Sequence, residues 1–166
     1  MSDYWINWAQ LATDETLYLI GGGALLILGN ERSTFDIDYV GNDLPEPSDQ
    51  LAMAIQKLAD EMQIEVDPVP LDEFIPLPTD ADQRHRLVGQ FGRLTAYIFD
   101  PYSIAISKLD RGFESDLQDI VFLIRQGLVD FEQLTAYGHD VLERRRGFDL
   151  ERDSFLAHLA TVAAML

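Results

Sequence analysis

The most informative part of this chain is the pair of segments Leu19-Ile20-Gly21-Gly22-Gly23-Ala24 and Arg32-Ser33-Thr34-Phe35-Asp36-Ile37-Asp38. Apolar residues 16–20 predict a β-strand, the glycines after it predict a turn, and residues 22–29 predict a helix. A second strand is predicted over residues 35–40. This order of elements is expected to place the glycine turn and the second strand at the same end of adjacent strands.

Two aspartates, Asp36 and Asp38, stand two residues apart on the second predicted strand, so their side chains face the same way. Two ionised carboxylates held that close repel each other unless a cation lies between them. Such oxygen ligands suit Mg²⁺ or Mn²⁺, which usually arrive with phosphates. Backbone N–H groups of the turn could receive those phosphates, which makes Gly22 and Gly23 candidate ligands. The pattern indicates a phosphoryl- or nucleotidyl-transfer site.

Each motif also has a plain explanation when it is taken singly. A glycine triplet after a strand is often only a tight turn, and an Asp-x-Asp pair arises by chance on solvated strands of an aspartate-rich chain. Their occurrence in this order, inside apolar strands, favours the functional interpretation.

The residues resemble a known superfamily. Gly22-Gly23 followed by Asp36-Ile37-Asp38 is similar to the signature of the polymerase-β-like nucleotidyltransferases. The segment from Asp100-Pro101 to Lys108-Leu109, followed by Arg111 and Asp116, resembles the lysine-plus-aspartate block of the abortive-infection type nucleotidyltransferases. That branch includes bacterial toxins of toxin–antitoxin systems, and the Arg32-x-Thr34-x-Asp36 spacing resembles it as well.

The resemblance implies roles for particular residues. Asp36 and Asp38 would hold one or two Mg²⁺ ions, and members of the superfamily often add a third carboxylate from a neighbouring strand. Glu65 and Asp67 are the two candidates, as metal ligand or base, and the sequence does not choose between them. Gly23 stands where many relatives carry serine, so one phosphate hydrogen bond is expected to be absent.

The later block carries the remaining candidates. By resemblance Lys108 binds phosphate and Asp116 completes the site, although Asp119 lies on the same helix face and competes for that role. In the plain interpretation, the Lys108 ammonium reaches water from a helix surface. Arg32 is a candidate phosphate contact, and a capping role or a surface ion pair explains it equally well.

Composition limits the class of protein. The chain has 166 residues, of which 47% are hydrophobic, so it is long enough for one domain with a real core. It has no cysteine, no run of the ~20 apolar residues that a membrane span needs, and no signal-peptide pattern, so a cytoplasmic protein is expected.

The 29 acidic against 12 basic residues give a net charge of −17, which opposes binding to long polyanions. Composition so rich in acid and poor in lysine resembles that of proteins from high-salt cytoplasm.

The predicted fold is of the α/β (α+β) class, with a small mixed β-sheet, flanking helices and a C-terminal helical segment. Residues 1–100 are expected to form the nucleotidyltransferase core, and residues 101–166 a helical segment that completes the site.

Residues 70–84, with their acidic residues and prolines, are predicted to be a loop. Trp5, Trp8 and Leu11 predict an amphipathic helix over residues 4–11. Further strands are predicted over 64–66, 86–90 and 93–99, and further helices up to Met62 and over 101–109, 116–126, 131–146 and 151–165.

The sequence therefore predicts a metal-dependent nucleotidyltransferase that moves NMP from an NTP to a hydroxyl on RNA, protein or a small molecule. Resemblance to the toxin branch implies a place in a toxin–antitoxin or phage-defence module. The alternative is a catalytically weak nucleotidyltransferase fold that binds a cognate partner protein or another copy of itself through its apolar C-terminal helix. A third interpretation is an acidic metal-binding module without nucleotide chemistry.

Overall fold

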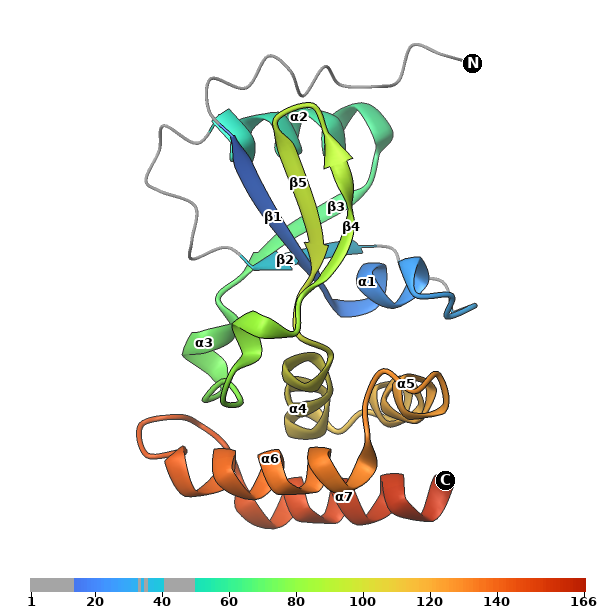
Figure 1. The fold of residues 1–166 in the computed structure, drawn as a ribbon, viewed down its shortest axis with the longest axis vertical. Helices are drawn as coiled ribbons and strands as arrows, with labels where there is room; N and C mark the ends of the chain where they lie inside the picture. Colours follow the sequence, from blue (N-terminus) through green and yellow to red (C-terminus); the bar gives the residue numbers. More distant parts are fainter. Residues whose placement is uncertain (1–13, 33, 35, 41–49) are drawn as a thin grey trace. The chain divides into compact units, whose positions relative to one another are not determined.

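The computed structural model describes residues 14–32, 34, 36–40 and 50–166 (Figure 1). The predicted helix over residues 4–11 lies outside them. The chain divides into two compact units. The first, called the sheet unit, comprises the described residues up to Val69 and the segment Arg86–Phe99; the second, called the helical unit, comprises Pro70–His85 and Asp100–Leu166.

The sheet unit contains a five-stranded mixed sheet in the order β3-β2-β1-β5-β4. Strand β1 pairs antiparallel with β2 and parallel with β5, while β2 pairs parallel with β3 and β4 antiparallel with β5. The predicted fold class, a mixed sheet with flanking helices and a C-terminal helix, is confirmed. The strands are β1 (Glu15–Ile20), β2 (Asp36–Val40), β3 (Glu65–Val69), β4 (Arg86–Phe91) and β5 (Leu94–Ile98), and the helices of this unit are α1 (Gly21–Ile27) and α2 (Gln50–Met62).

Side-chain alternation gives the sheet two different faces. Leu51 and Ile55 of α2 pack with Tyr39 and Leu94 of the sheet in one buried cluster, and Leu19 packs against it. Because successive residues of a strand point to opposite faces, the even-numbered residues of β2 lie on the face away from that cluster. The hydrophobic alternation of β2 therefore decides which face carries the carboxylates.

In the helical unit, helix α4 (Pro101–Arg111) begins after Asp100, whose side chain caps its N-terminus. The Asp100 carboxylate accepts hydrogen bonds from the backbone N–H of Tyr102 at 3.2 Å and of Ser103 at 3.1 Å, and Pro101 occupies the first turn. Gly112 ends the helix with φ of 68°, as glycine commonly does. The helices of this unit are α3 (Leu71–Phe74), α4 (Pro101–Arg111), α5 (Glu114–Arg125), α6 (Phe131–Arg144) and α7 (Arg152–Met165), with a 3₁₀ turn at Ala81–Gln83.

Residues 70–84 are more ordered than the predicted loop, because they contain α3 and the 3₁₀ turn. Their apolar side chains Leu71 and Ile75 are buried, and this burial offsets the effect of the prolines and acidic residues. Arg84 attaches the segment to α4. Its guanidinium forms a two-point hydrogen bond with Asp100, at 2.7 and 2.9 Å, and lies over the ring of Tyr137.

Among the described helices, none has the length and apolar character that crossing a membrane requires.

Candidate active site

Gly21 and Asp38 are packed directly against each other at the end of β1. The β1–β2 register pairs Ile20 with Asp38, so the first residue of α1 lies beside this aspartate. A Cβ atom at position 21 would lie 2.8 Å from Cγ of Asp38 and closer still to its Oδ2. Gly21 also has φ of +65°, which side-chain-bearing residues rarely adopt. Glycine is thus required here both by the backbone and by the carboxylate.

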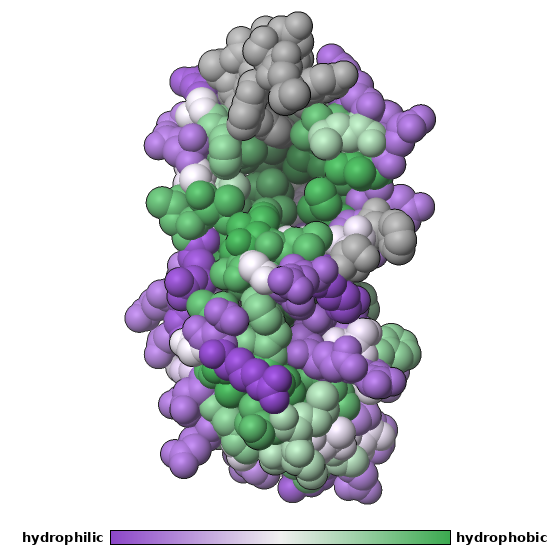
Figure 2. Space-filling view, turned by 90° about the vertical axis from the view of Figure 1, so that its right-hand side faces the viewer, coloured by the Kyte–Doolittle hydropathy of each residue, from purple (hydrophilic) through white to green (hydrophobic). Residues whose placement is uncertain are grey.

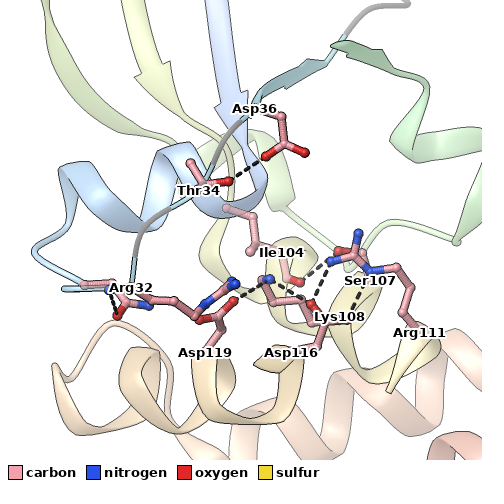
Figure 3. Close-up of polar contacts among 10 residues, drawn as sticks. Arg32, Thr34, Asp36, Ile104, Ser107, Lys108, Arg111, Asp116 and Asp119 are labelled. Atoms are coloured by element: carbon pink, nitrogen blue, oxygen red, sulfur yellow. Dashed lines mark hydrogen bonds and ion pairs between the residues drawn. The ribbon is translucent and has the colours of Figure 1, made fainter. Parts of the chain in front are cut away.

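Gly22 is packed against Thr34 in the same way as Gly21 is packed against Asp38. A Cβ atom at position 22 would lie 2.7 Å from Oγ1 of Thr34. That hydroxyl donates a hydrogen bond of 2.5 Å to Oδ1 of Asp36 (Figure 3). A Cβ at Gly23 would meet the backbone of Ile37 only at the ordinary distance of 3.7 Å. Gly21 and Gly22 therefore leave room for polar side chains of the following segment, whereas Gly23 has ordinary packing.

The two candidate third carboxylates lie on the neighbouring strand. In the parallel pairing of β2 with β3, Asp36 is opposite Glu65 and Asp38 is opposite Asp67, so all four carboxylates share one sheet face. Glu65 and Asp67 are exposed. Within the described ranges, no three carboxylate or histidine side chains converge as a ready-made metal site. The choice between Glu65 and Asp67 stays open.

Arg32 lies on the connection between α1 and β2 and is exposed. Its backbone N–H donates to Oδ1 of Asn30 at 3.3 Å, which positions the main chain at this point. Contact of Arg32 with phosphate stays a prediction.

Lys108 lies in a buried ionic cluster of the helical unit. It is only 2% exposed, and its Nζ donates to Oδ1 of Asp116 at 3.0 Å and to Oδ2 of Asp119 at 2.8 Å (Figure 3). Asp116 and Asp119 are buried as well. The lysine comes from α4 and both aspartates come from α5, so the cluster joins these two helices.

Arg111 completes the cluster at its exposed edge. Its Nη2 and Nε donate to the two oxygens of Asp116, at 2.7 and 3.2 Å. Burial acts to raise the pKa of Asp116, but the hydrogen bond from Arg111 and the charge of Lys108 outweigh it and lower that pKa. Lys108 and Arg111 thus supply two positive charges beside the carboxylates of Asp116 and Asp119, with Lys108 buried and Arg111 half exposed.

The structure brings some of the predicted site residues together and explains others differently. Asp36 and Asp38 lie on one strand beside the glycine turn, and Lys108 contacts Asp116 directly. Asp119 is also bonded to the lysine, so both aspartates contact one ammonium, and which of them completes the proposed site stays open. The phosphate-binding role predicted for Lys108 stays a prediction, and its observed contacts are those of a helix-joining ion cluster.

The sequence pattern does not single out two contributions. Gly21 is part of a glycine run in the sequence, and the structure shows that it is the glycine that lies against a carboxylate. Thr34 belongs to the Arg32-x-Thr34-x-Asp36 spacing, and the structure shows that it is the donor that orients Asp36. The sequence signal for both was present in the consecutive glycines and in the threonine two residues before the aspartate.

Comparison with protein-family models identifies the family of the chain. Residues 7–153 match the model described as "Nucleotidyltransferase of unknown function (DUF6036)". Searches of curated proteins and of solved structures find no match. The matched range includes both the glycine–aspartate pattern and the lysine–aspartate segment. The chain therefore belongs to the DUF6036 family of nucleotidyltransferases.

Proposed function

We propose that the chain is a Mg²⁺-dependent nucleotidyltransferase that transfers an NMP group from an NTP to a hydroxyl acceptor. The observation that carries this proposal is the placement of Asp36 and Asp38 on one face of β2, with Gly21 packed against Asp38. Membership of the family supports nucleotidyl transfer as the general activity, and the local geometry supports the choice of these residues for it.

The donor set fits a magnesium ion. Mg²⁺ is usually held by one or two carboxylates together with waters and substrate phosphates, rather than by a complete cage of protein ligands. Two aspartates on one strand face would provide such a partial site. When bound, the ion would supply compensation for negative charge on the triphosphate.

The chain's own residues orient the reactants. The hydroxyl of Thr34 donates a hydrogen bond to Oδ1 of Asp36. Because this bond orients the carboxylate, it also sets the direction in which Oδ2 of Asp36 points. Backbone N–H groups of Gly22 and Gly23, with Arg32, would bind the phosphates. The acceptor hydroxyl oxygen forms a bond to the α-phosphorus, the bond to the bridging oxygen breaks, and pyrophosphate leaves. Glu65 or Asp67 would take the hydroxyl proton, because both share the face of Asp36 and Asp38.

The abortive-infection branch and a toxin–antitoxin role belong to the same proposal. Their support is the Arg32-x-Thr34-x-Asp36 spacing and the segment around Lys108. The net charge of −17 disfavours a long polyanion as acceptor, so a protein or small-molecule hydroxyl is the first class to test, followed by RNA.

Calorimetry with an NTP, in the presence and absence of Mg²⁺, tests the binding step. Asp36→Asn should abolish the Mg²⁺-dependent binding heat. Asp60→Asn is the matched control, because it removes the same charge from the exposed surface of α2. Unchanged metal-dependent binding by the Asp36 variant would refute the proposed site.

A transfer assay then tests the reaction. The protein is incubated with each α-³²P-labelled NTP and extract of the source cells, and the labelled product is treated with protease or with ribonuclease. Label that disappears with one of these treatments identifies the acceptor class. Metal-dependent NTP binding with no labelled product from any NTP would favour the alternative of a binding protein with this fold.

A further inference from the structure

The sheet face that carries the carboxylates also carries two tyrosines, one on β1 and one on β5. Ile20 of β1 pairs with Asp38 of β2, so Tyr18, two residues before Ile20, points to the same face as this aspartate. Tyr97 of β5 pairs with Tyr18 and shares that face. Leu19, the neighbour of Tyr18 in β1, packs instead against the buried cluster on the other face. The two tyrosines and the aspartates therefore lie on one side of the sheet.

The tyrosines lie within reach of a nucleotide held at Asp38. The β1–β2 register places Tyr18 opposite Val40, which is two residues along β2 from Asp38. Diagonal neighbours of this kind lie about 7–8 Å apart across antiparallel strands. In an NTP a single ribose links the α-phosphate to the base. A base can therefore reach Tyr18 while the phosphates stay beside Asp38.

The tyrosine rings belong to a small aromatic cluster with a defined geometry. The rings of Tyr18 and Tyr97 are stacked, with centroids 5.7 Å apart and an angle of 27° between their planes. Phe99 meets Tyr18 edge to face, with centroids 5.9 Å apart. Phe99 is itself buried, and its backbone N–H donates to the carbonyl of Leu19 at 2.9 Å. Both tyrosines are half-buried. Because the rings are already ordered by their neighbours, a further aromatic ring can stack on them at a low cost in entropy.

The surroundings of the two rings suit a base better than a phosphate. Within β1 and β5, the residues of this face are uncharged, and the tyrosines are followed, away from the aspartates, by the paired residues Thr16 and Thr95. Threonine hydroxyls both donate and accept hydrogen bonds, as the polar edge of a base requires. Leu87 of β4 pairs with Tyr97 and is 64% exposed. Figure 2 shows hydrophobic side chains gathered on the sheet unit, in the upper half of that view.

We infer that Tyr18 and Tyr97 form the base-binding part of the NTP site, and that the base is a purine. The inference rests on the proposed function, because it needs the triphosphate to lie beside Asp36 and Asp38. Stacking on an aromatic side chain is open to every base, and its strength depends on the area that is covered. A purine has two fused rings and covers more of the tyrosine pair than a pyrimidine does.

Calorimetry on the full chain in the presence of Mg²⁺ tests the inference with three ligands: ATP, UTP and ribose 5′-triphosphate, which has no base. The wild type should bind ATP about 10-fold more tightly than ribose 5′-triphosphate, and several-fold more tightly than UTP. Tyr18→Leu should lower the affinity for ATP to that for ribose 5′-triphosphate, whose own binding should not change. Tyr18→Phe keeps the ring and should behave as the wild type does. Tyr39→Leu is the matched control, because it removes a ring from the opposite face of the sheet and should keep the wild-type ratio of the two affinities.

Binding of ribose 5′-triphosphate reports on the phosphate site of each variant, so a variant that fails to fold is recognised by the loss of this binding. Tyr97→Leu then repeats the test on the second ring. Equal affinities of the wild type for ATP and ribose 5′-triphosphate would overturn the inference and leave the proposed function intact. An unchanged ratio in both leucine variants, or equal affinities for ATP and UTP, would overturn it as well. If none of the three ligands binds in a Mg²⁺-dependent way, the proposed function itself is refuted, and the inference with it.

Discussion

Gly21 is packed against the carboxylate of Asp38, since a Cβ atom at position 21 would lie 2.8 Å from Cγ of Asp38 and closer still to its Oδ2. The glycine has no side chain to displace the carboxylate, and its left-handed backbone directs α1 away from the strand end. One residue therefore serves both the backbone turn and the position of a proposed metal ligand.

Gly21→Ala should displace the Asp38 carboxylate and abolish Mg²⁺-dependent NTP binding. The left-handed backbone alone costs a residue with a side chain about 1–2 kcal/mol. Gly29→Ala is the control for this cost, because Gly29 also has a positive φ, of +96°, but nothing lies within 4 Å of a Cβ there. Calorimetry and urea unfolding of both variants separate the two effects. Normal NTP binding by Gly21→Ala would show that Asp38 can move without loss of the site.

Thr34→Val should weaken Mg²⁺-dependent NTP binding about 10-fold or more, because the hydroxyl that orients Asp36 is lost. Thr34→Ser keeps the hydroxyl and should bind as the wild type does. The measurement is an NTP titration at fixed Mg²⁺ concentration, with the unfolding midpoint as the check on folding. Equal affinities for the valine and serine variants would exclude a role for this hydrogen bond.

Lys108→Met should lower the free energy of unfolding by about 3–5 kcal/mol, because it removes the shared partner from the buried ion pairs with Asp116 and Asp119. The other lysine of the chain, Lys57, is the control: its ion pair with Glu61 is largely exposed, and Lys57→Met should cost less than about 1 kcal/mol. Urea unfolding measures both.

A second variant separates structure from phosphate binding at Lys108. Lys108→Met combined with Asp119→Leu should recover much of the lost stability, since Asp116 keeps Arg111 and no buried charge remains unpaired. If instead Lys108→Met unfolds at the wild-type urea concentration but fails to bind NTP, the lysine is a phosphate ligand and not a helix-joining residue.

Asp110→Asn should raise the thermal midpoint at pH 7. Burial, and next the charge of Asp149, raise the pKa of Asp110, and His158 and Arg111 offset this only in part. A raised folded-state pKa means that ionised Asp110 opposes folding at neutral pH, and that this cost disappears as the pH falls below the ordinary carboxyl pKa. Melting curves at pH 7 and near pH 3 should thus show a gain only at pH 7. Asp60→Asn, on an exposed surface, should show no such gain.

Added KCl should raise the thermal midpoint of the wild type. The net charge of −17 makes the folded state repel itself, and raising ionic strength from 0.1 to 1 M shortens the screening length from about 10 to about 3 Å. KCl is chosen because sulfate stabilises folded proteins in general. A midpoint that is the same at low and molar KCl would contradict adaptation of this surface to salt.

Local sequence patterns were sufficient for most elements of the fold. The apolar strand before the glycines and the alternation of Asp36, Ile37 and Asp38 predicted β1, β2 and the shared face of the carboxylates, because strand geometry acts within a few residues. The Asp100-Pro101 pair predicted the start of α4 for the same reason. Within residues 70–84 the predicted loop is wrong over Leu71–Phe74 and Ala81–Gln83, which are helical, since the burial of Leu71 and Ile75 depends on distant chain segments.

The mixed α/β class, and two carboxylates on the strand that follows the glycine turn, could be predicted from the order of residues along the chain. The packing of the folded chain was needed to show that Gly21 is the glycine that lies against Asp38, and that the buried ammonium of Lys108 contacts two aspartates. Spacing along the chain reports the direction of a side chain within its own element. Burial and close packing arise between elements, where the desolvation of a charge and its partners on another helix are set by the fold.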